Sequence, residues 1–202
     1  MSVMLGWDIE NEQLAKGYKV ICGVDEAGKG PLAGPVTAAA CILPLGLYIS
    51  DLKDSKLLSA KKRERIYDEI VANAVAYAVD FASVEEIDEL NILNATMLAM
   101  KRAVDKLKIQ PDLALIDGNI SRGFEIDTQT VIRGDTLSPS IAAASVLAKV
   151  TRDRMCAQLD KLYPEYKIRR HKGYGTELHR NLLRKYGPSP IHRKSFLGFL
   201  SR

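Results

Sequence analysis

Five short apolar runs, rich in β-branched residues and bounded by glycine or proline, constrain the fold more than any other feature of the chain. The early runs follow one another closely, whereas the later ones alternate with helical patterns. This order predicts an α/β domain with a mixed sheet covered by helices. The runs lie at residues 18–25, 35–43, 74–82, 112–117 and 128–133.

Helix signals separate several of these runs. Ser83 and Glu86 match a capping box, and Ser138-Pro139 combines an N-cap with proline at the first helical position. The residues from 44 to 58 are expected to form a long loop. The predicted helical stretches are 59–73, a helix starting at 83, 94–107, 141–162, and 176–186, which Gly187-Pro188 closes.

Length and composition favour one globular domain. The 202 residues are 47% hydrophobic and 27% charged, which is ordinary for a soluble domain. There is no apolar run long enough for a membrane span, and the first 13 residues do not resemble a signal peptide. The three cysteines form no CxxC pair, and we expect them to be reduced core thiols. A cytoplasmic monomer without membrane contact is the expectation.

Charge is distributed unevenly along the chain. Residues 161–202 contain eleven Lys and Arg against two acids, a net charge of +9, whereas residues 1–160 have a net charge of −5. A basic end on an acidic body suggests a polyanionic partner, although a solvated basic tail explains the composition equally well.

Four acidic residues stand at or just beyond the ends of predicted strands. Asp25 and Glu26 are adjacent and precede a glycine-rich turn, Asp117 ends another run, and Asp135 precedes the long helix. Sites in α/β sheets form beyond the carboxyl ends of strands, so we expect these four side chains to converge. Both members of the adjacent pair reach one site only if the backbone turns there, which the glycines permit.

Such a cluster needs cations. Two carboxylates about 5 Å apart repel by roughly 3 kcal/mol at an effective dielectric constant of about 20. Hard oxygen ligands suit Mg²⁺ or Mn²⁺, and four carboxylates balance two divalent ions, as in phosphodiester hydrolysis. The alternative is that these are ordinary turn and cap residues, which by itself explains Asp117 better.

A nucleotide-binding P-loop is a competing interpretation of the segment from Gly23 to Lys29. The spacing fits G-x-x-x-x-G-K, but Gly30 stands where Ser or Thr should bind Mg²⁺. The two acids would also lie in the loop that should hold phosphates, so we reject this interpretation.

The segment from Gly23 to Pro35, GVDEAGKGPLAGP, closely resembles the first motif of bacterial ribonuclease HII. Later segments agree in the same order, so the resemblance runs from about residue 18 to 196. They are Asp54-Ser-Lys56, Leu115-Ile-Asp-Gly-Asn119, Gly134-Asp135 with the residues from Ile141 to Lys149 and Thr151-Arg-Asp153, His171-Lys-Gly-Tyr174, and Ile191-His-Arg-Lys-Ser-Phe196.

The resemblance implies a ribonuclease H-like fold: a five-stranded mixed sheet flanked by helices, with a C-terminal helical region. We expect residues 1–202 to form a single domain, with a catalytic core at about 18–160 and a basic substrate-binding region and tail at about 161–202. Because 24 residues precede Asp25, we expect no extra N-terminal domain of the ribonuclease HIII kind.

The resemblance also implies the chemistry. Asp25, Glu26, Asp117 and Asp135 are expected to be catalytic and to hold two Mg²⁺ or Mn²⁺ ions. The implied substrates are RNA–DNA hybrids and duplex DNA containing a ribonucleotide, with cleavage 5′ of the ribonucleotide that leaves 5′-phosphate and 3′-hydroxyl ends. The expected substrate-binding residues are Gly28, Lys29, Gly30, Lys56, Lys172 and Tyr174.

Two departures from the family pattern stand out. The family's first motif usually reads Gly-Arg-Gly, whereas this chain has Lys29, and lysine does not reproduce a bidentate arginine contact. Leu57 also stands where the family commonly has a second lysine. A non-catalytic nucleic-acid-binding module and a different nuclease of the same fold are the alternative functions.

Overall fold

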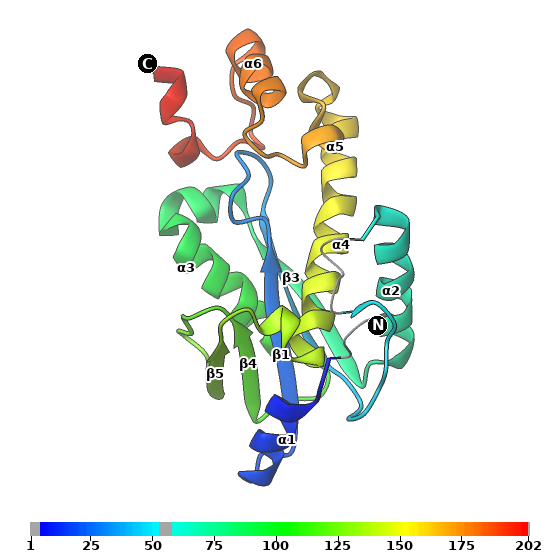
Figure 1. Cartoon of the computed structure of the whole chain (residues 1–202). Helices are drawn as coiled ribbons and strands as arrows, with labels where there is room; N and C mark the ends of the chain where they lie inside the picture. The colour runs from blue at the N-terminus through cyan, green and yellow to red at the C-terminus, as the bar shows by residue number, and fades with distance from the viewer. Residues whose placement is uncertain (1–4, 53–57, 202) are drawn as a thin grey trace.

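The computed structural model describes residues 5–52 and 58–201, and a five-stranded sheet forms its centre (Figure 1). The strand order is β3-β2-β1-β4-β5, with antiparallel pairing among the first three and parallel pairing of β4 with β1 and β5. The expected five-stranded mixed sheet is therefore confirmed. The strands are β1 (Ile21–Ala27), β2 (Val36–Ile42), β3 (Ala76–Ala82), β4 (Leu113–Asp117) and β5 (Asp127–Val131).

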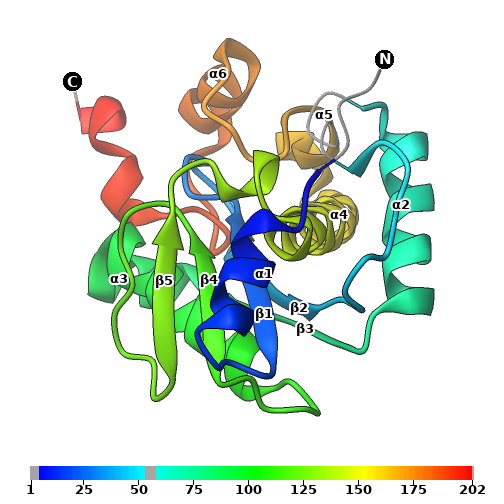
Figure 2. The ribbon, with the colours of Figure 1, turned by 60° about the horizontal axis from the view of Figure 1, so that its bottom comes forward.

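Helices cover both faces of the sheet. Strand side chains alternate between the two faces, so each strand contributes to the core on both sides. On β2, Ala38 and Ala40 belong to the core beneath α3 (Val84–Asp105), whereas Ala39 and Cys41 belong to the core beneath α4 (Pro139–Leu162). The second of these cores also includes residues of α2 (Ala60–Asn73), which packs beside α4 (Figure 2).

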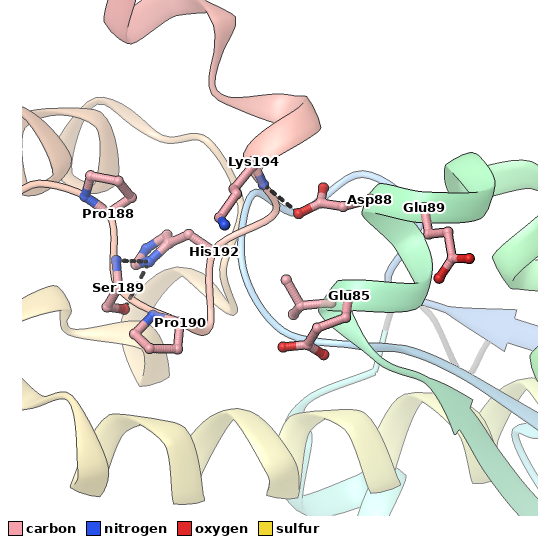
Figure 3. A pocket seen from close by; sticks show the side chains of 9 residues that line it. Glu85, Asp88, Glu89, Pro188, Ser189, Pro190, His192 and Lys194 are labelled. Carbon is pink, nitrogen blue, oxygen red and sulfur yellow. Dashed lines mark hydrogen bonds between the residues drawn. The ribbon is translucent and has the colours of Figure 1, made fainter.

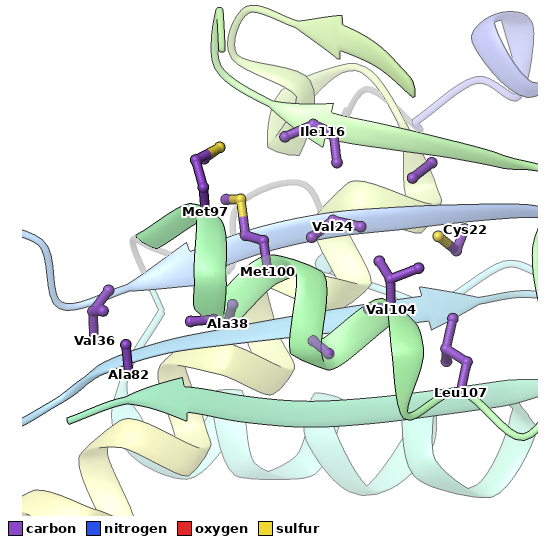
Figure 4. Close-up of a cluster of buried hydrophobic side chains, with 14 of the residues drawn as sticks. Cys22, Val24, Val36, Ala38, Ala82, Met97, Met100, Val104, Leu107 and Ile116 are labelled. Carbon is purple, nitrogen blue, oxygen red and sulfur yellow. The ribbon is translucent and has the colours of Figure 1, made fainter. Parts of the chain in front are cut away.

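The α3 face is a tightly packed apolar layer. Met97, Met100 and Val104 of α3 lie over Cys22 and Val24 of β1 (Figure 4). On the opposite face, Gly23 brings β1 so close to α4 that an added Cβ would overlap the Ser140 backbone. This close approach fixes the register between the central strand and the long helix.

Side-chain caps begin the helices at the predicted positions. The hydroxyls of Ser59, Ser138 and Thr176 accept hydrogen bonds from main-chain N–H groups of the first turns of α2, α4 and α6 (Glu177–Tyr186). Ser83 and Glu86 form the complete capping box. These N-termini were predictable because capping depends on residues close together in sequence.

The structure differs from the sequence prediction in three places. The stretches predicted near 83 and at 94–107 form one element, α3, with a kink at Asn91, where φ is 66°. An unpredicted helix, α1, spans Asp8–Ala15. Strand β1 also continues through both acidic residues to Ala27. The described part of the 44–58 segment contains no α-helix or strand, as expected.

The three cysteines, Cys22, Cys41 and Cys156, are buried free thiols, as predicted. Burial raises the pKa of Cys22 to about 12, so this thiol stays protonated near neutral pH. Within residues 5–52 and 58–201, no helix combines the length and the apolar character that a membrane span requires.

The chain after α4 forms a cap of short helices beyond the end of β1 (Figure 1). An apolar cluster, which includes Leu32, Tyr166, Ile168 and Leu183, joins this cap to the β1–β2 connection. The cap contains η3 (Pro164–Tyr166), α5 (Ile168–His171), α6, η4 (Lys194–Phe196) and η5 (Gly198–Ser201).

Candidate active site

Asp25 and Glu26 lie near the C-terminal end of β1, paired with Ala39 and Ala38 of β2. Asp25 is only 1% exposed, and its Oδ1 accepts a hydrogen bond from the Glu26 N–H at 2.7 Å. The backbone does not turn between the two acids, contrary to the geometry we expected. The turn follows at Gly28, where φ is +101°.

Asp117 and Asp135 lie close to each other at the ends of neighbouring elements. Asp117 is the last residue of β4, which runs parallel to β1 with Val24 opposite Ile116. Asp135 is in η2 (Gly134–Thr136), and the Gly134 N–H donates to Asp117 Oδ1 at 2.7 Å. A Cβ at position 134 would lie 3.3 Å from Asp117 Oδ1 and 2.5 Å from Ile141 Cδ1. Any larger residue at position 134 would therefore require the Ile141 side chain to shift.

Sheet topology brings the four acidic residues to one end of the sheet, because β1 and β4 are parallel neighbours. Among the described residues, however, no three His, Cys, Asp or Glu side chains are grouped closely enough to hold a metal ion. Glu26 instead pairs with Lys29, with 2.8 Å between Oε1 and Nζ. The donor chemistry and the strand-end placement fit divalent cations, but coordination by all four side chains remains a prediction.

The glycine-rich turn and Tyr174 border a pocket of about 360 Å³. A Cβ at Gly28 would overlap the Arg152 guanidinium, and one at Gly30 would lie 3.5 Å from the Tyr174 ring. The turn and the tyrosine, which are distant in sequence, are thus neighbours. The residues that line the pocket are Glu26, Ala27, Gly28, Lys29, Gly30, Ser145, Lys149, Arg152 and Tyr174.

Of the two other predicted substrate-binding residues, Lys172 and Lys56, the structure describes only Lys172. Lys172 has a left-handed backbone with φ of 52°, and its carbonyl accepts a hydrogen bond from Arg152 Nη1 at 3.1 Å. It therefore lies next to the pocket through its backbone. Lys56 falls outside the described residues. Lys149 pairs with Asp153 at 2.6 Å, which is the intrahelical ion pair that their spacing predicts.

Three histidines form a buried network beneath Tyr174. The Ser189 N–H donates to His192 Nδ1 at 3.1 Å, so His192 Nε2 carries the proton and faces His179 Nε2 at 3.1 Å. The other ring nitrogen of His179 lies 3.0 Å from the Tyr174 carbonyl oxygen, and its ring stacks on His171. Burial lowers the pKa values of His179 and His192 to about 4. Both rings are therefore neutral at pH 7.

A second pocket, of about 650 Å³, lies between the start of α3 and the segment from Pro188 to Lys194 (Figure 3). Its α3 side presents Glu85, Asp88 and Glu89, and Asp88 accepts a hydrogen bond from the Lys194 N–H. Acidic side chains repel a phosphate backbone. The smaller pocket beside the glycine turn has one acid, Glu26, against the cations Lys29, Lys149 and Arg152, so it fits a nucleic acid better.

Sequence reasoning missed two residues that shape the site. Arg152 and Arg193 are fully buried and contact the β1–β2 connection. Both stand in segments that carried the family resemblance, Thr151-Arg-Asp153 and Ile191-His-Arg, but no local pattern assigned a role to either. Their role is visible only in the tertiary structure, where both side chains donate hydrogen bonds to main-chain carbonyls of the β1–β2 connection.

Comparison with known proteins agrees with the fold and the motifs. A family model described as Ribonuclease HII matches residues 22–198. Ribonuclease HII from Burkholderia thailandensis is 59% identical over 178 residues, which cover 88% of this chain and 83% of the relative. The crystal structure of ribonuclease H2 from Pyrococcus horikoshii OT3 is 25% identical, with a TM-score of 0.72 and coverage of 88% of this chain and 93% of that chain.

A more distant structure shares the fold alone. The crystal structure of Bst-RNase HIII in complex with Mn²⁺ is 19% identical, with a TM-score of 0.67. The match covers 88% of this chain and 67% of that chain.

Proposed function

The chain belongs to the ribonuclease HII family, and we propose how its residues cleave RNA that is paired with DNA. The protein is a type 2 ribonuclease H, an endonuclease that hydrolyses the RNA strand of RNA–DNA hybrids. We propose that it also incises duplex DNA 5′ of an embedded ribonucleotide and leaves 5′-phosphate and 3′-hydroxyl ends. The observation that carries this proposal is the juxtaposition of acidic strand ends with a glycine turn and Tyr174.

Asp25, Glu26, Asp117 and Asp135 are the proposed ligands of two divalent cations, Mg²⁺ or Mn²⁺. Bound there, the cations would supply hydroxide near neutral pH and stabilise the departing 3′-oxygen. The placement of Asp25 supports a ligand role, because its side chain is buried in β1 and its Oδ1 is oriented by the Glu26 N–H. Asp117 is oriented by the Gly134 N–H, which restrains its carboxylate at the end of β4.

We propose that the glycine-rich turn and Tyr174, which lies next to it, recognise the substrate. The 2′-hydroxyl separates RNA from DNA, and main-chain groups of Gly28, Lys29 and Gly30 are proposed to detect it. Tyr174 is proposed to stack on the sugar of the next nucleotide, which favours deoxyribose at that position. The 3.5 Å approach of its ring to a Cβ built at Gly30 supports this pairing.

Basic residues around the turn are proposed to bind phosphates. Lys172 adjoins Tyr174 in sequence, Lys56 comes from the motif outside the described residues, and Lys29 borders the pocket. The ion pair between Lys29 and Glu26 gives Lys29 a second proposed task, which is to restrain a candidate ligand. Phosphate contacts position the duplex and make its binding weaken with salt. We also propose that the protein acts as a monomer in the cytoplasm.

The test is an incision assay with Mg²⁺ and three duplexes: all-DNA, RNA–DNA hybrid, and DNA with one ribonucleotide. The wild type should cut the second and third only. Asp25→Asn and Asp117→Asn should lose cleavage by at least about a hundredfold, because removing a metal-site charge weakens transition-state stabilisation. Asp127→Asn is the control. Asp127 lies at the start of β5, at the end of the strand opposite to the acidic residues, and it accepts a hydrogen bond from the Tyr18 hydroxyl.

The other outcomes distinguish the alternatives. Binding to all three duplexes without incision would identify a non-catalytic nucleic-acid-binding module. Incision of all-DNA duplexes would indicate a different nuclease of the same fold. Near-normal cleavage by both Asn variants would remove the proposed role of the two aspartates.

A further inference from the structure

Arg193, in the C-terminal cap, is fully buried against the turn between β1 and β2. Its Nη2 donates to the Gly28 carbonyl at 2.7 Å, and its Nη1 donates to the Lys29 carbonyl at 2.9 Å. Its Nε donates to the Gly34 carbonyl at 2.9 Å. A buried guanidinium is costly unless it is hydrogen-bonded, and here each of its three nitrogens donates to a main-chain carbonyl of one short segment. The side chain therefore holds the shape of that segment.

The geometry of the peptide bond extends this contact to the pocket. In a trans peptide, C=O and N–H point in opposite directions, and no cis peptide occurs among the described residues. The Gly28 carbonyl shares its peptide with the Lys29 N–H, and the Lys29 carbonyl with the Gly30 N–H. Both N–H groups therefore point away from Arg193. Within the described chain neither donates to a protein acceptor, and both residues line the pocket beside Tyr174.

Arg152 supports the same segment from α4, but with longer contacts. Its Nη2 and Nε lie 3.3 Å from the carbonyl oxygens of Ala33 and Pro35. Hydrogen bonds of 2.7–2.9 Å are shorter than these, as expected when a charged donor is well aligned. Burial and the nearby Arg152 lower the pKa of Arg193 to about 9. Arg193 thus remains charged at neutral pH, and its hydrogen bonds stay charge-assisted.

We propose that Arg193 is a positioning residue for ribose recognition: it clamps the Gly28 and Lys29 carbonyls so that the N–H groups of Lys29 and Gly30 face the 2′-hydroxyl. The inference rests on the proposed function of the turn. Arg193 itself touches neither the substrate nor the acidic residues. Its removal should therefore affect discrimination between ribose and deoxyribose more than affinity for a duplex in general.

The experiment compares wild type with Arg193→Lys, which keeps a cation but loses the planar fork. Binding to all-DNA duplex and to the same duplex with one ribonucleotide is measured by fluorescence anisotropy, with Ca²⁺ replacing Mg²⁺ to prevent turnover. We expect the preference for the ribonucleotide duplex to fall about tenfold, equivalent to about 1.4 kcal/mol. Affinity for all-DNA duplex should stay within about twofold, since phosphate contacts supply most non-specific binding.

Arg102→Lys is the matched control. Arg102 lies on α3, pairs with Glu86 and donates to the Phe81 carbonyl, away from the turn. This variant should keep the full preference even if it lowers the melting temperature. A full preference in folded Arg193→Lys would overturn the inference. A wild type without any preference would instead contradict the proposed function.

A rescue experiment covers the case in which Arg193→Lys unfolds at the assay temperature. Arg193→Ala is assayed with methylguanidinium, and with methylammonium at the same concentration as control. Recovery of the ribonucleotide preference with methylguanidinium alone supports the clamp. Equal effects of the two cations would contradict it.

Discussion

At the residue scale, Gly28 is the position where substitution has the clearest physical consequence. Its φ of +101° disfavours side chains, and a Cβ would overlap the Arg152 guanidinium. The Asp25–Glu26 pair was predictable because an apolar run ends in two acids before glycines. The role of Arg193 was not, because its bond to Gly28 spans 165 positions in sequence.

We expect Gly28→Ala to lose at least about tenfold in cleavage rate and to unfold more readily than wild type, because it combines backbone strain of about 1–2 kcal/mol with a clash. Gly46→Ala is the matched control. Gly46 also has a positive φ, +82°, but a Cβ there meets nothing within 4 Å. The Gly46→Ala variant should lose only the stability that backbone strain costs, and it should cleave at the normal rate. Equal losses of activity in the two variants would contradict the role given to the turn.

At the element scale, the N-terminal helix α1 stabilises the start of α4. The Glu10 carboxylate is buried, and its Oε1 accepts hydrogen bonds from the Ser138 hydroxyl at 2.6 Å and the Ser140 N–H at 3.2 Å. A carboxylate at this end is favoured by the helix dipole and by the N–H groups that the helix leaves unsatisfied. Helix α4 was predictable from Ser138-Pro139, whereas this second cap comes from a residue 128 positions away.

Glu10→Ala should lower the free energy of unfolding by about 1.5–3 kcal/mol, the usual value of hydrogen bonds to a charged group. Urea unfolding measures this change. Glu12→Ala is the comparison, since Glu12 forms an exposed ion pair with Lys16, and such pairs contribute little. Equal stabilities of the two variants would show that α1 does not stabilise α4 through Glu10.

At the scale of the whole molecule, the basic C-terminal cap lies at the end of the sheet beyond β1 (Figure 1). The order of strands and helices predicted the sheet, because continuous apolar runs and local helix caps carry that information. The attachment of the cap depends instead on contacts such as the pairing of Ala33 with His192. We retain as a proposal that residues 1–202 form one domain with a functional division near residue 160.

The buried histidines make the stability of the whole chain depend on pH. Burial holds the pKa values of His179 and His192 at about 4, so both are neutral when folded, whereas the unfolded chain protonates them below about pH 6.5. Protons therefore favour unfolding between these values. The contribution of these histidines to the free energy of unfolding should be fully present well above pH 6.5. It should fall as the pH drops towards 4, by about 2 kcal/mol for each histidine at pH 5.

Denaturant unfolding between pH 5 and 7.5 measures this dependence. In His179→Gln, the slope of stability against pH should be about halved, because one of the two strongly shifted groups is removed. An unchanged slope would assign the effect to other groups.

The central claim is that Asp25, Glu26, Asp117 and Asp135 jointly hold two divalent cations. Anomalous diffraction from crystals grown with Mn²⁺ tests it most directly, because it locates the ions without reference to activity. The account predicts two anomalous peaks at the shared end of β1 and β4, in direct contact with oxygens of all four carboxylates. Peaks elsewhere, or ions at this end that leave Asp117 or Asp135 uncoordinated, would contradict it.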